Sequence, residues 1–369
     1  MLSLALFALL TISFPLFQQS AEVAAKFNRA VELQRREELE QAAEEYRGLL
    51  AIAPNYSEAQ ANYGAVLSRL GRYEEAVKAY QAALSLNPRL TPVMLNLGIA
   101  HHRAGEFVKA AEVLKDFVRI SPDNLQAHRL LGISLVELGR ESEAVAHLQP
   151  AMAEANEDVT VLYYLGLAYL RLQRSEREEV IQRLARSGEG KPLAKMLQGQ
   201  LHLERFEFDL AASRLEEAAA LRPDLPRLQG LLALAYLKLG RTKDAIVCFE
   251  RELSHAPDDF FVLYYLGYAQ DKLGNLSDAK GRVEAALRVN PESSEANTLY
   301  GKILFRQGQV KAALDPIERA VKQQPLDSET RYLRARIYQR LGRAEDAKRE
   351  FAEVDRLNAK ERSGEKSRP

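Results

Sequence analysis

The sequence predicts an all-α solenoid built from about ten helix-turn-helix repeats of 34 residues each. Prolines recur at that spacing, small residues recur at fixed positions inside the period, and glycines recur where one predicted helix turns into the next. Self-similarity with a period of about 20–50 residues is typical of stacked repeat proteins. The three patterns share one period, so they predict one continuous array.

The proline spacing sets the length and the numbering of the repeats. Successive prolines lie 34 residues apart at Pro54, Pro88 and Pro122, and again at Pro223, Pro257, Pro291 and Pro325. The 101 residues between Pro122 and Pro223 are one short of three periods, so the array continues there with one residue deleted. With the closing proline at position 32, repeat 1 begins at residue 23 and repeat 10 ends at residue 361. Proline cannot continue a helix, so it helps to end the second helix of each repeat.

Small and bulky residues alternate at fixed positions of the repeat. Position 20 is alanine in every repeat except repeat 5, where it is Glu178, and position 24 is bulky in most repeats. Position 8 is always small: Ala30, Gly64, Gly98, Gly132, Gly166, Gly199, Ala233, Gly267, Gly301 and Ala335. We expect the paired helices to approach closely at the small positions, with stacked repeats sharing one continuous core.

Glycine marks the turn between the two helices of most repeats, because it adopts the left-handed backbone that ends a helix. These turn glycines are Gly71, Gly105, Gly139, Gly240, Gly274, Gly308 and Gly342.

Repeat 5, residues 159–191, keeps the length but loses the turn glycine, the alanine and the bulky residue. Its charged second helix should end near Ser187, followed by a loop over residues 187–192. That loop lacks the first glycine of a phosphate-binding loop, because residue 185 is alanine, so we do not expect phosphate binding. We predict a softer joint here, between repeats 1–4 (residues 23–158) and repeats 6–10 (residues 192–361).

The pattern resembles the tetratricopeptide repeat family. Repeat 2, SEAQANYGAVLSRLGRYEEAVKAYQAALSLNPRL at residues 57–90, carries the family's glycine, alanine, aromatic residue and closing proline, and the resemblance covers about residues 23–361. The family's first-helix tryptophan is missing throughout; residues such as Met94, Leu162 and Leu263 take its place. The resemblance implies a right-handed superhelix, a concave groove lined by the first helices at positions 2, 5, 6, 9, 12 and 13, and a protein or peptide partner.

An asparagine row occupies position 6 of the first three repeats, at Asn28, Asn62 and Asn96. An amide supplies two donors and an acceptor, which suits the backbone of an extended peptide. Alternatively, asparagine is simply tolerated at a solvent-exposed position. The carboxylate clamp of chaperone-binding family members is not expected, because positions 5 and 9 carry apolar residues such as Phe27 and Val31.

Aromatic residues replace the amides on the same face of the later repeats. An apolar groove favours an apolar helix or an extended segment as ligand. The alternatives are that these rings pack between neighbouring first helices, or that they bind a saccharide or a lipid. The candidates are Tyr163, Tyr164, Tyr264, Tyr265, Tyr268, Phe305 and Tyr332.

Cations recur at position 13 and could meet an acidic partner, or they could be the solvated helix ends that the macrodipole favours. The row consists of Arg35, Arg69, Arg103, Arg171, Lys238, Lys272, Arg306 and Arg340. Arg69, Arg103 and the neighbouring His102 are candidate groove residues. The six histidines show no HExxH and no cysteine–histidine spacing, so we expect neither a metal nor a cofactor.

The composition of the chain and the extent of the repeats argue against several classes of function. Lysine plus arginine and aspartate plus glutamate both total 51, so a nucleic-acid partner is not expected. The single cysteine, Cys248, allows no internal disulfide. The repeats leave no room for a separate catalytic domain and offer no nucleophile–base pair, so we do not expect an enzyme.

The first residues, Met1 to Phe17, are almost wholly apolar. Residues 1–21 fit a signal peptide, which predicts export to the bacterial cell envelope, periplasmic or extracellular. The alternatives are a membrane anchor formed by residues 2–17, the only expected membrane contact, and an apolar helix packed on repeat 1. At the other end, residues 362–369 are polar and should be disordered, which favours a monomer or weak self-association over stacking into a self-assembled scaffold.

Overall fold

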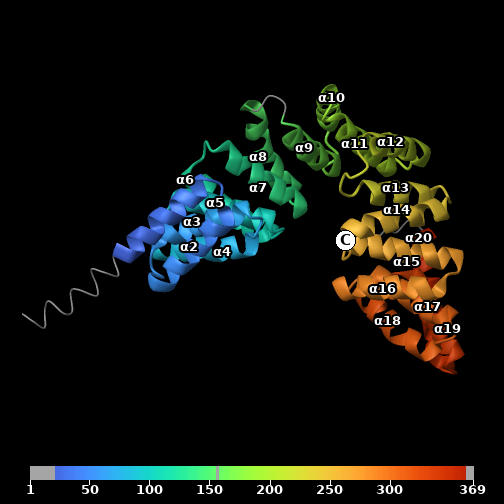
Figure 1. Ribbon diagram of the computed structural model, residues 1–369. Coiled ribbons are helices and arrows are strands. Elements are labelled where there is room, and N and C mark those ends of the chain that lie inside the picture. The colour runs from blue at the N-terminus through green and yellow to red at the C-terminus, as the bar shows by residue number, and fades with distance from the viewer. Residues whose placement is uncertain (1–20, 155–157, 363–369) are drawn as a thin grey trace, which may run out of the picture. The chain divides into compact units, whose positions relative to one another are not determined.

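The computed structural model describes residues 21–154 and 158–362, and these residues form helices and short connections without a strand. The predictions for the N-terminal apolar segment and for the polar tail therefore lie outside the described residues, apart from Ala21 and Arg362. The chain divides into two compact units, residues 1–187 and residues 188–369 (Figure 1). No helix in the described ranges is both long enough and apolar enough to cross a membrane.

Both units consist of paired helices that follow the predicted repeats. In the first unit, residues 21–35 are helical and pair with the next helix. The remaining helices of this unit are α2 (Leu39–Ile52), α3 (Ser57–Arg69), α4 (Tyr73–Leu86), α5 (Thr91–Arg103), α6 (Phe107–Ile120), α7 (Leu125–Glu137), α8 (Glu141–Glu154), α9 (Val159–Arg171) and α10 (Arg177–Arg186).

The second unit repeats the same pairing, so the predicted all-α repeat fold is confirmed. Its helices are α11 (Lys191–Glu204), α12 (Phe208–Leu221), α13 (Leu228–Lys238), α14 (Thr242–His255), α15 (Phe260–Leu273), α16 (Leu276–Val289), α17 (Ser294–Arg306), α18 (Val310–Gln323), α19 (Ser328–Arg340) and α20 (Ala344–Arg362).

The first helices of successive repeats form the inner layer of each unit. The helix α5 contacts α3 and α7, and α15 contacts α13 and α17, in addition to the second helices beside them. Among the described helices, no second helix contacts the second helix of a neighbouring repeat. Since the first helices lie closer together than the second helices, each unit curves toward its first helices, which therefore line the concave face.

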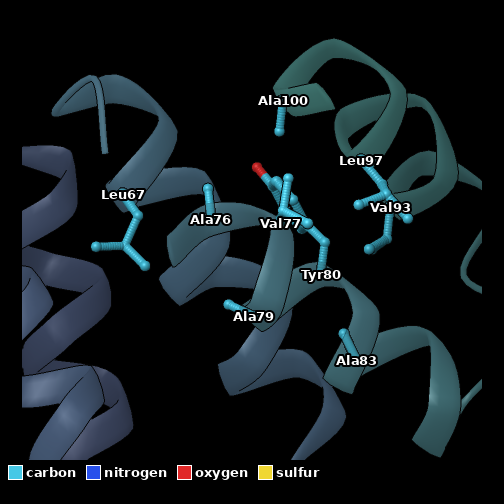
Figure 2. Packing of buried hydrophobic residues seen from close by; sticks show 9 residues of the cluster. All are labelled: Leu67, Ala76, Val77, Ala79, Tyr80, Ala83, Val93, Leu97 and Ala100. Carbon is cyan, nitrogen blue, oxygen red and sulfur yellow. The ribbon is translucent and has the colours of Figure 1, made fainter. Parts of the chain in front are cut away.

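The core is shared between successive repeats. Leu67 of α3, Tyr80 and its neighbours on α4, and Leu97 of α5 belong to one buried cluster, whose nine members Figure 2 labels. At Gly64 an added Cβ would lie 2.7 Å from the Tyr80 ring, and at Gly98 it would lie 2.6 Å from Leu114. Position 8 is therefore small because the bulky side chain at position 24 of the same repeat lies directly on it.

The turn between the paired helices is left-handed throughout, including the repeats without glycine. The seven turn glycines have φ between 70° and 83°. At the same position repeats 1, 5 and 6 carry Glu37, Gln173 and Phe206, with φ of 63°, 54° and 59°. Repeat 5 thus loses the glycine but keeps the turn, because the packing of the two helices imposes the backbone conformation.

The second helix of repeat 5 ends where the sequence predicts, but the following loop is shorter than expected. The helix α10 stops at Arg186 and packs through the buried Val180, Ile181 and Leu184 instead of the usual alanine. The predicted loop over residues 187–192 is wrong at its end, since α11 already begins at Lys191 with a proline in its first turn. A proline costs little there because the first backbone N–H groups of a helix lack partners inside the helix.

Candidate functional site

The asparagine row lies on the first helices, but its members differ in their surroundings. Asn28 is exposed and Asn96 is partly exposed. Neither side chain makes a hydrogen bond to the described part of the chain. Asn62 instead hydrogen-bonds the hydroxyl of Tyr46, which donates in turn to Gln34 at 3.0 Å. Two of the three amides are therefore available to a ligand, while the third also supports the packing between repeats 1 and 2.

A hollow of about 380 Å³ lies beside Asn62 on the concave face of the first two repeats. Arg69 also lines it, and pairs there with Glu37 of the preceding repeat. The complete lining is Val31, Gln34, Arg35, Glu37, Asn62 and Arg69. The structure thus brings the predicted groove residues Asn62 and Arg69 together with Arg35 of the position-13 row, and adds Gln34 and Glu37, which the sequence analysis did not single out.

Two other members of the position-13 row also hold the preceding repeat. Arg171 donates to the carbonyl oxygen of Val136 and to Glu141, both at 3.0 Å. Arg306 donates to the carbonyl oxygen of the buried Asp271 at 3.0 Å. These arginines, together with Arg69, reach back by one repeat, so part of the row stabilises the stacking. Arg103 remains exposed at its helix end.

His102 connects repeats 3 and 4. Its Nδ1 lies 2.9 Å from the hydroxyl of Ser134, and that hydroxyl donates to the carbonyl oxygen of Leu130 at 2.8 Å. The serine oxygen must then accept from His102, which places the proton on Nδ1. Burial lowers the pKa of His102, so the neutral ring connects the two repeats by a hydrogen bond.

The tyrosines of repeat 5 contact each other within the first compact unit. The rings of Tyr163 and Tyr164 are 5.3 Å apart with an edge-on arrangement. The Tyr164 hydroxyl donates to a carboxylate oxygen of Glu137, one repeat earlier, at 3.0 Å. Both rings are partly buried, so they combine packing between first helices with an accessible edge.

Three tyrosines on α15 form an aromatic cluster in the second compact unit, defined by Tyr264, Tyr265 and Tyr268. The rings of Tyr264 and Tyr265 are 4.9 Å apart, and both lie in the field of Glu295 on α17. Burial raises the pKa of Tyr264 to about 12. Tyr264 and Tyr268 pack partly against the core of repeats 8 and 9, so the packing alternative holds for part of this surface.

The remaining aromatic candidates have other contacts. The Arg336 guanidinium lies 5.4 Å from the ring centroid of Phe305, and Tyr332 packs on Phe351 of α20, with ring centroids 5.7 Å apart. The sequence analysis missed Phe261, which is 38% exposed and lies 4.6 Å from Tyr265 between ring centroids. Its signal was the run FFVLYY, which puts four aromatic residues on one helix.

Metal-ligating and thiol side chains occur across the described residues. Among them, no group of three or more histidine, cysteine, aspartate or glutamate side chains is arranged to hold a metal ion. Cys248 is buried, and burial raises the pKa of its thiol, which disfavours a reactive thiolate. The geometry is that of a binding surface built on helices.

These features define an α-solenoid of stacked helix-turn-helix repeats, a class that presents extended surfaces to other molecules. A tetratricopeptide repeat model matches residues 27–92, 64–124, 129–192 and 264–328, and two further tetratricopeptide repeat models match residues 202–261 and 328–361. The chain belongs to the tetratricopeptide repeat family. Membership in this family indicates a protein–protein interaction scaffold.

Solved structures share the fold at low sequence identity. One is the hetero-tetramer of Cut9 and Hcn1 from the APC/C, with a TM-score of 0.56, 14% identity, and coverage of 92% of this chain and 81% of the other. Another is a monomeric mutant of IFIT1 with m7Gppp-AAAA, with a TM-score of 0.53, 14% identity, and coverage of 91% and 90%. At this identity the likeness concerns the fold alone. No curated protein sequence matches the chain.

Proposed function

We propose that this chain is a non-catalytic scaffold that holds an extended segment of another polypeptide on the concave face of its first helices. The observation that carries the proposal is the pair of amides at Asn28 and Asn96, which lie at the same position of repeats 1 and 3 without a hydrogen bond in the described chain. Each amide can donate to and accept from a peptide backbone. The residues that line the hollow of repeats 1 and 2 lie between Asn28 and Asn96 in the sequence.

The aromatic cluster suggests which side chains the second compact unit would accept. Tyr264, Tyr265 and Tyr268 offer ring faces, and Glu295 adds a negative charge close to them. Such a surface suits a segment that combines apolar with basic side chains, because cations are attracted both to aromatic faces and to the carboxylate.

Affinity capture followed by binding measurements tests the proposal. The wild-type chain and an Asn28→Ala, Asn96→Ala variant are compared for capture of polypeptides from a cell-envelope extract, and the captured segment is then titrated by calorimetry. Each lost amide bond is worth about 0.5–1.5 kcal/mol, so the double variant should bind roughly tenfold or more weakly. Adding Asn62→Ala should also weaken the packing of Tyr46, which makes the triple variant less informative.

Asn55→Ala is the matched control, because Asn55 is an exposed asparagine in the turn between repeats 1 and 2. Circular dichroism on every variant separates lost binding from lost folding. Equal affinity of the wild type and the double variant would exclude the amides from the site. If Tyr265→Ala then abolishes binding, the aromatic cluster holds the segment; if no polypeptide is captured, the scaffold proposal fails and a saccharide or lipid becomes the ligand to test.

We also propose that the chain is exported, on the strength of the apolar run from Met1 to Phe17. Fractionation of cells that express the full chain, together with N-terminal sequencing, tests this. A periplasmic or extracellular product that lacks its first 21 residues or so is expected. Recovery of the intact chain in the membrane fraction would favour the anchor instead, and an intact cytoplasmic chain would overturn export.

A further inference from the structure

A pair of histidines outside the concave-face site lies at the contact between α7 and α8. The Nδ1 atoms of His128 and His147 are 3.1 Å apart. Their ring centroids are 5.0 Å apart, with an angle of 49° between the ring planes. Both side chains are partly exposed, so a small ion can reach them. The two residues are 19 positions apart in sequence, and only the pairing of the two helices brings them together.

The other nitrogen of His128 determines where its lone pair lies. The Nε2 atom is 2.9 Å from the carbonyl oxygen of Pro122, in the turn before α7. A carbonyl oxygen only accepts, so Nε2 carries the proton and the lone pair of the neutral ring is on Nδ1. This lone pair is directed toward His147. A metal-binding histidine typically has this arrangement, in which the second ring nitrogen donates to a carbonyl group that fixes the ring.

The separation of the two Nδ1 atoms suits coordination of one ion. For a metal about 2.0–2.1 Å from each nitrogen, the N–metal–N angle would be roughly 95–100°. This angle lies between the octahedral and the tetrahedral values. The surrounding charges are mixed. Lys115 and Glu143 both act on His147, and Glu143 is held by Arg140 at 2.8 Å.

We propose that His128 and His147 form a two-histidine chelate for a divalent ion that prefers imidazole ligands, the class of Zn²⁺, Ni²⁺ and Cu²⁺. When the ion binds, the Nδ1 proton of His147 moves to Nε2 of the same ring by exchange with water, so both Nδ1 lone pairs face the ion. Water fills its remaining positions, since no third histidine, cysteine or carboxylate of the described residues converges on this point. The site joins α7 to α8 within repeat 4 and leaves positions open to an outside donor group.

The test is calorimetric titration of the full chain, without a histidine tag, with Zn²⁺ and separately with Ni²⁺ at pH 7.5. One ion per chain is expected, with affinity lowered on the order of tenfold or more in His128→Ala and in His147→Ala. His255→Ala is the control, because His255 is an exposed histidine at the end of α14. NMR spectra of the histidine rings should show that Zn²⁺ shifts the signals of His128 and His147 before those of the other four.

Circular dichroism shows whether the His128→Ala variant is still folded, because this variant also loses the hydrogen bond to the carbonyl oxygen of Pro122. If that variant unfolds, His147→Ala alone decides, because it leaves this bond in place. Absence of binding to the wild type overturns the proposal. Equal weakening by His255→Ala, or unchanged affinity in His147→Ala, overturns it as well, since either result would mean that scattered surface histidines take up the ion.

Discussion

Glycine at position 8 and the large residue at position 24 are the pair that sets the distance between the two helices of a repeat. At Gly301 an added Cβ would lie 2.4 Å from Ile317 Cγ1 and 3.2 Å from the carbonyl oxygen of Ala313. Repeats with alanine at position 8, such as repeat 1 with Ala30 and Tyr46, carry a flat ring opposite it. A flat ring can rotate to leave room for the Cβ of alanine at position 8, whereas a branched aliphatic side chain cannot.

Gly301→Ala should therefore destabilise the second compact unit. Overpacking of a core position costs about 1–3 kcal/mol, and urea unfolding followed by circular dichroism measures it. Gly281→Ala is the control, because nothing lies within 4 Å of an added Cβ there. This control should gain up to about 1 kcal/mol from the better helix propensity of alanine. Equal stability of the two variants would refute the proposed contact.

Buried and partly buried tyrosines make the fold sensitive to alkaline pH. Burial is the largest cause that raises the pKa of Tyr46, Tyr236, Tyr264 and Tyr300, each to about 12, from the ordinary value of 10.0. A raised folded-state pKa means that stability is fully present below about pH 10 and is lost as pH rises from about 10 to about 12. Tyrosinate absorbance should rise together with the loss of helical signal. Full ionisation near pH 10 in a chain that stays folded would contradict this.

At the scale of elements, the left-handed turn between paired helices is the feature that every described repeat keeps. Phe206 adopts it with φ of 59° and is 78% exposed, beside Phe208 at a ring-centroid distance of 6.2 Å. An L-residue in this conformation costs roughly 1–2 kcal/mol. The second compact unit therefore contains one strained, exposed aromatic residue where other repeats have glycine.

Phe206→Gly should raise the free energy of unfolding by about 0.5–1 kcal/mol, because relief of strain exceeds the added chain entropy of glycine. The reverse change, Gly308→Ala, has φ of 77° and open space around the added Cβ, so it should lose about 1 kcal/mol from backbone strain alone. Both are measured by chemical unfolding. If Phe206→Gly were destabilising, the edge-on contact of the ring with Phe208 would have to outweigh the backbone strain.

At the scale of the whole molecule, the boundary between the two compact units falls after Ser187. This position is inside the loop that was predicted because repeat 5 lacks the consensus residues. Gly188 and Glu189 are exposed. Each unit has its own shared cores, such as the cluster around Tyr80 in the first and the one around Val283 in the second.

Limited proteolysis should therefore cut first in this connection, with trypsin after Arg186 and with a glutamate-specific protease after Glu189. Two fragments that keep their helical circular dichroism are the expected products, because each repeat needs only its neighbours to bury its core. The glycine turns of the other repeats serve as internal controls. A first cut at those turns, or even digestion along the chain, would contradict the predicted joint.

The number of repeats, the helix pairs and most of the turns were predictable from the sequence. These features depend on residues a fixed number of positions apart, as in the Gly64–Tyr80 contact, and the same spacing recurs along the chain. The packing of repeat 5 was harder to predict from the sequence, because Val180 and Leu184 fill the core there in place of the consensus residues. Among the groove candidates, Asn28 and Asn96 kept the expected exposure, whereas His102 and Arg171 hold neighbouring repeats together.

The sequence by itself determined the period, the left-handed turns at the seven glycines and the positions where helices must approach closely, because local sterics act over a few residues and repeat unchanged. Only the tertiary structure decided which polar groups meet. His128 and His147 on neighbouring helices, Asn62 with Tyr46, and Arg306 with the Asp271 carbonyl are such pairs. Their contacts depend on how one helix is rotated and displaced against the next, and no spacing in the sequence fixes that rotation for each individual side chain.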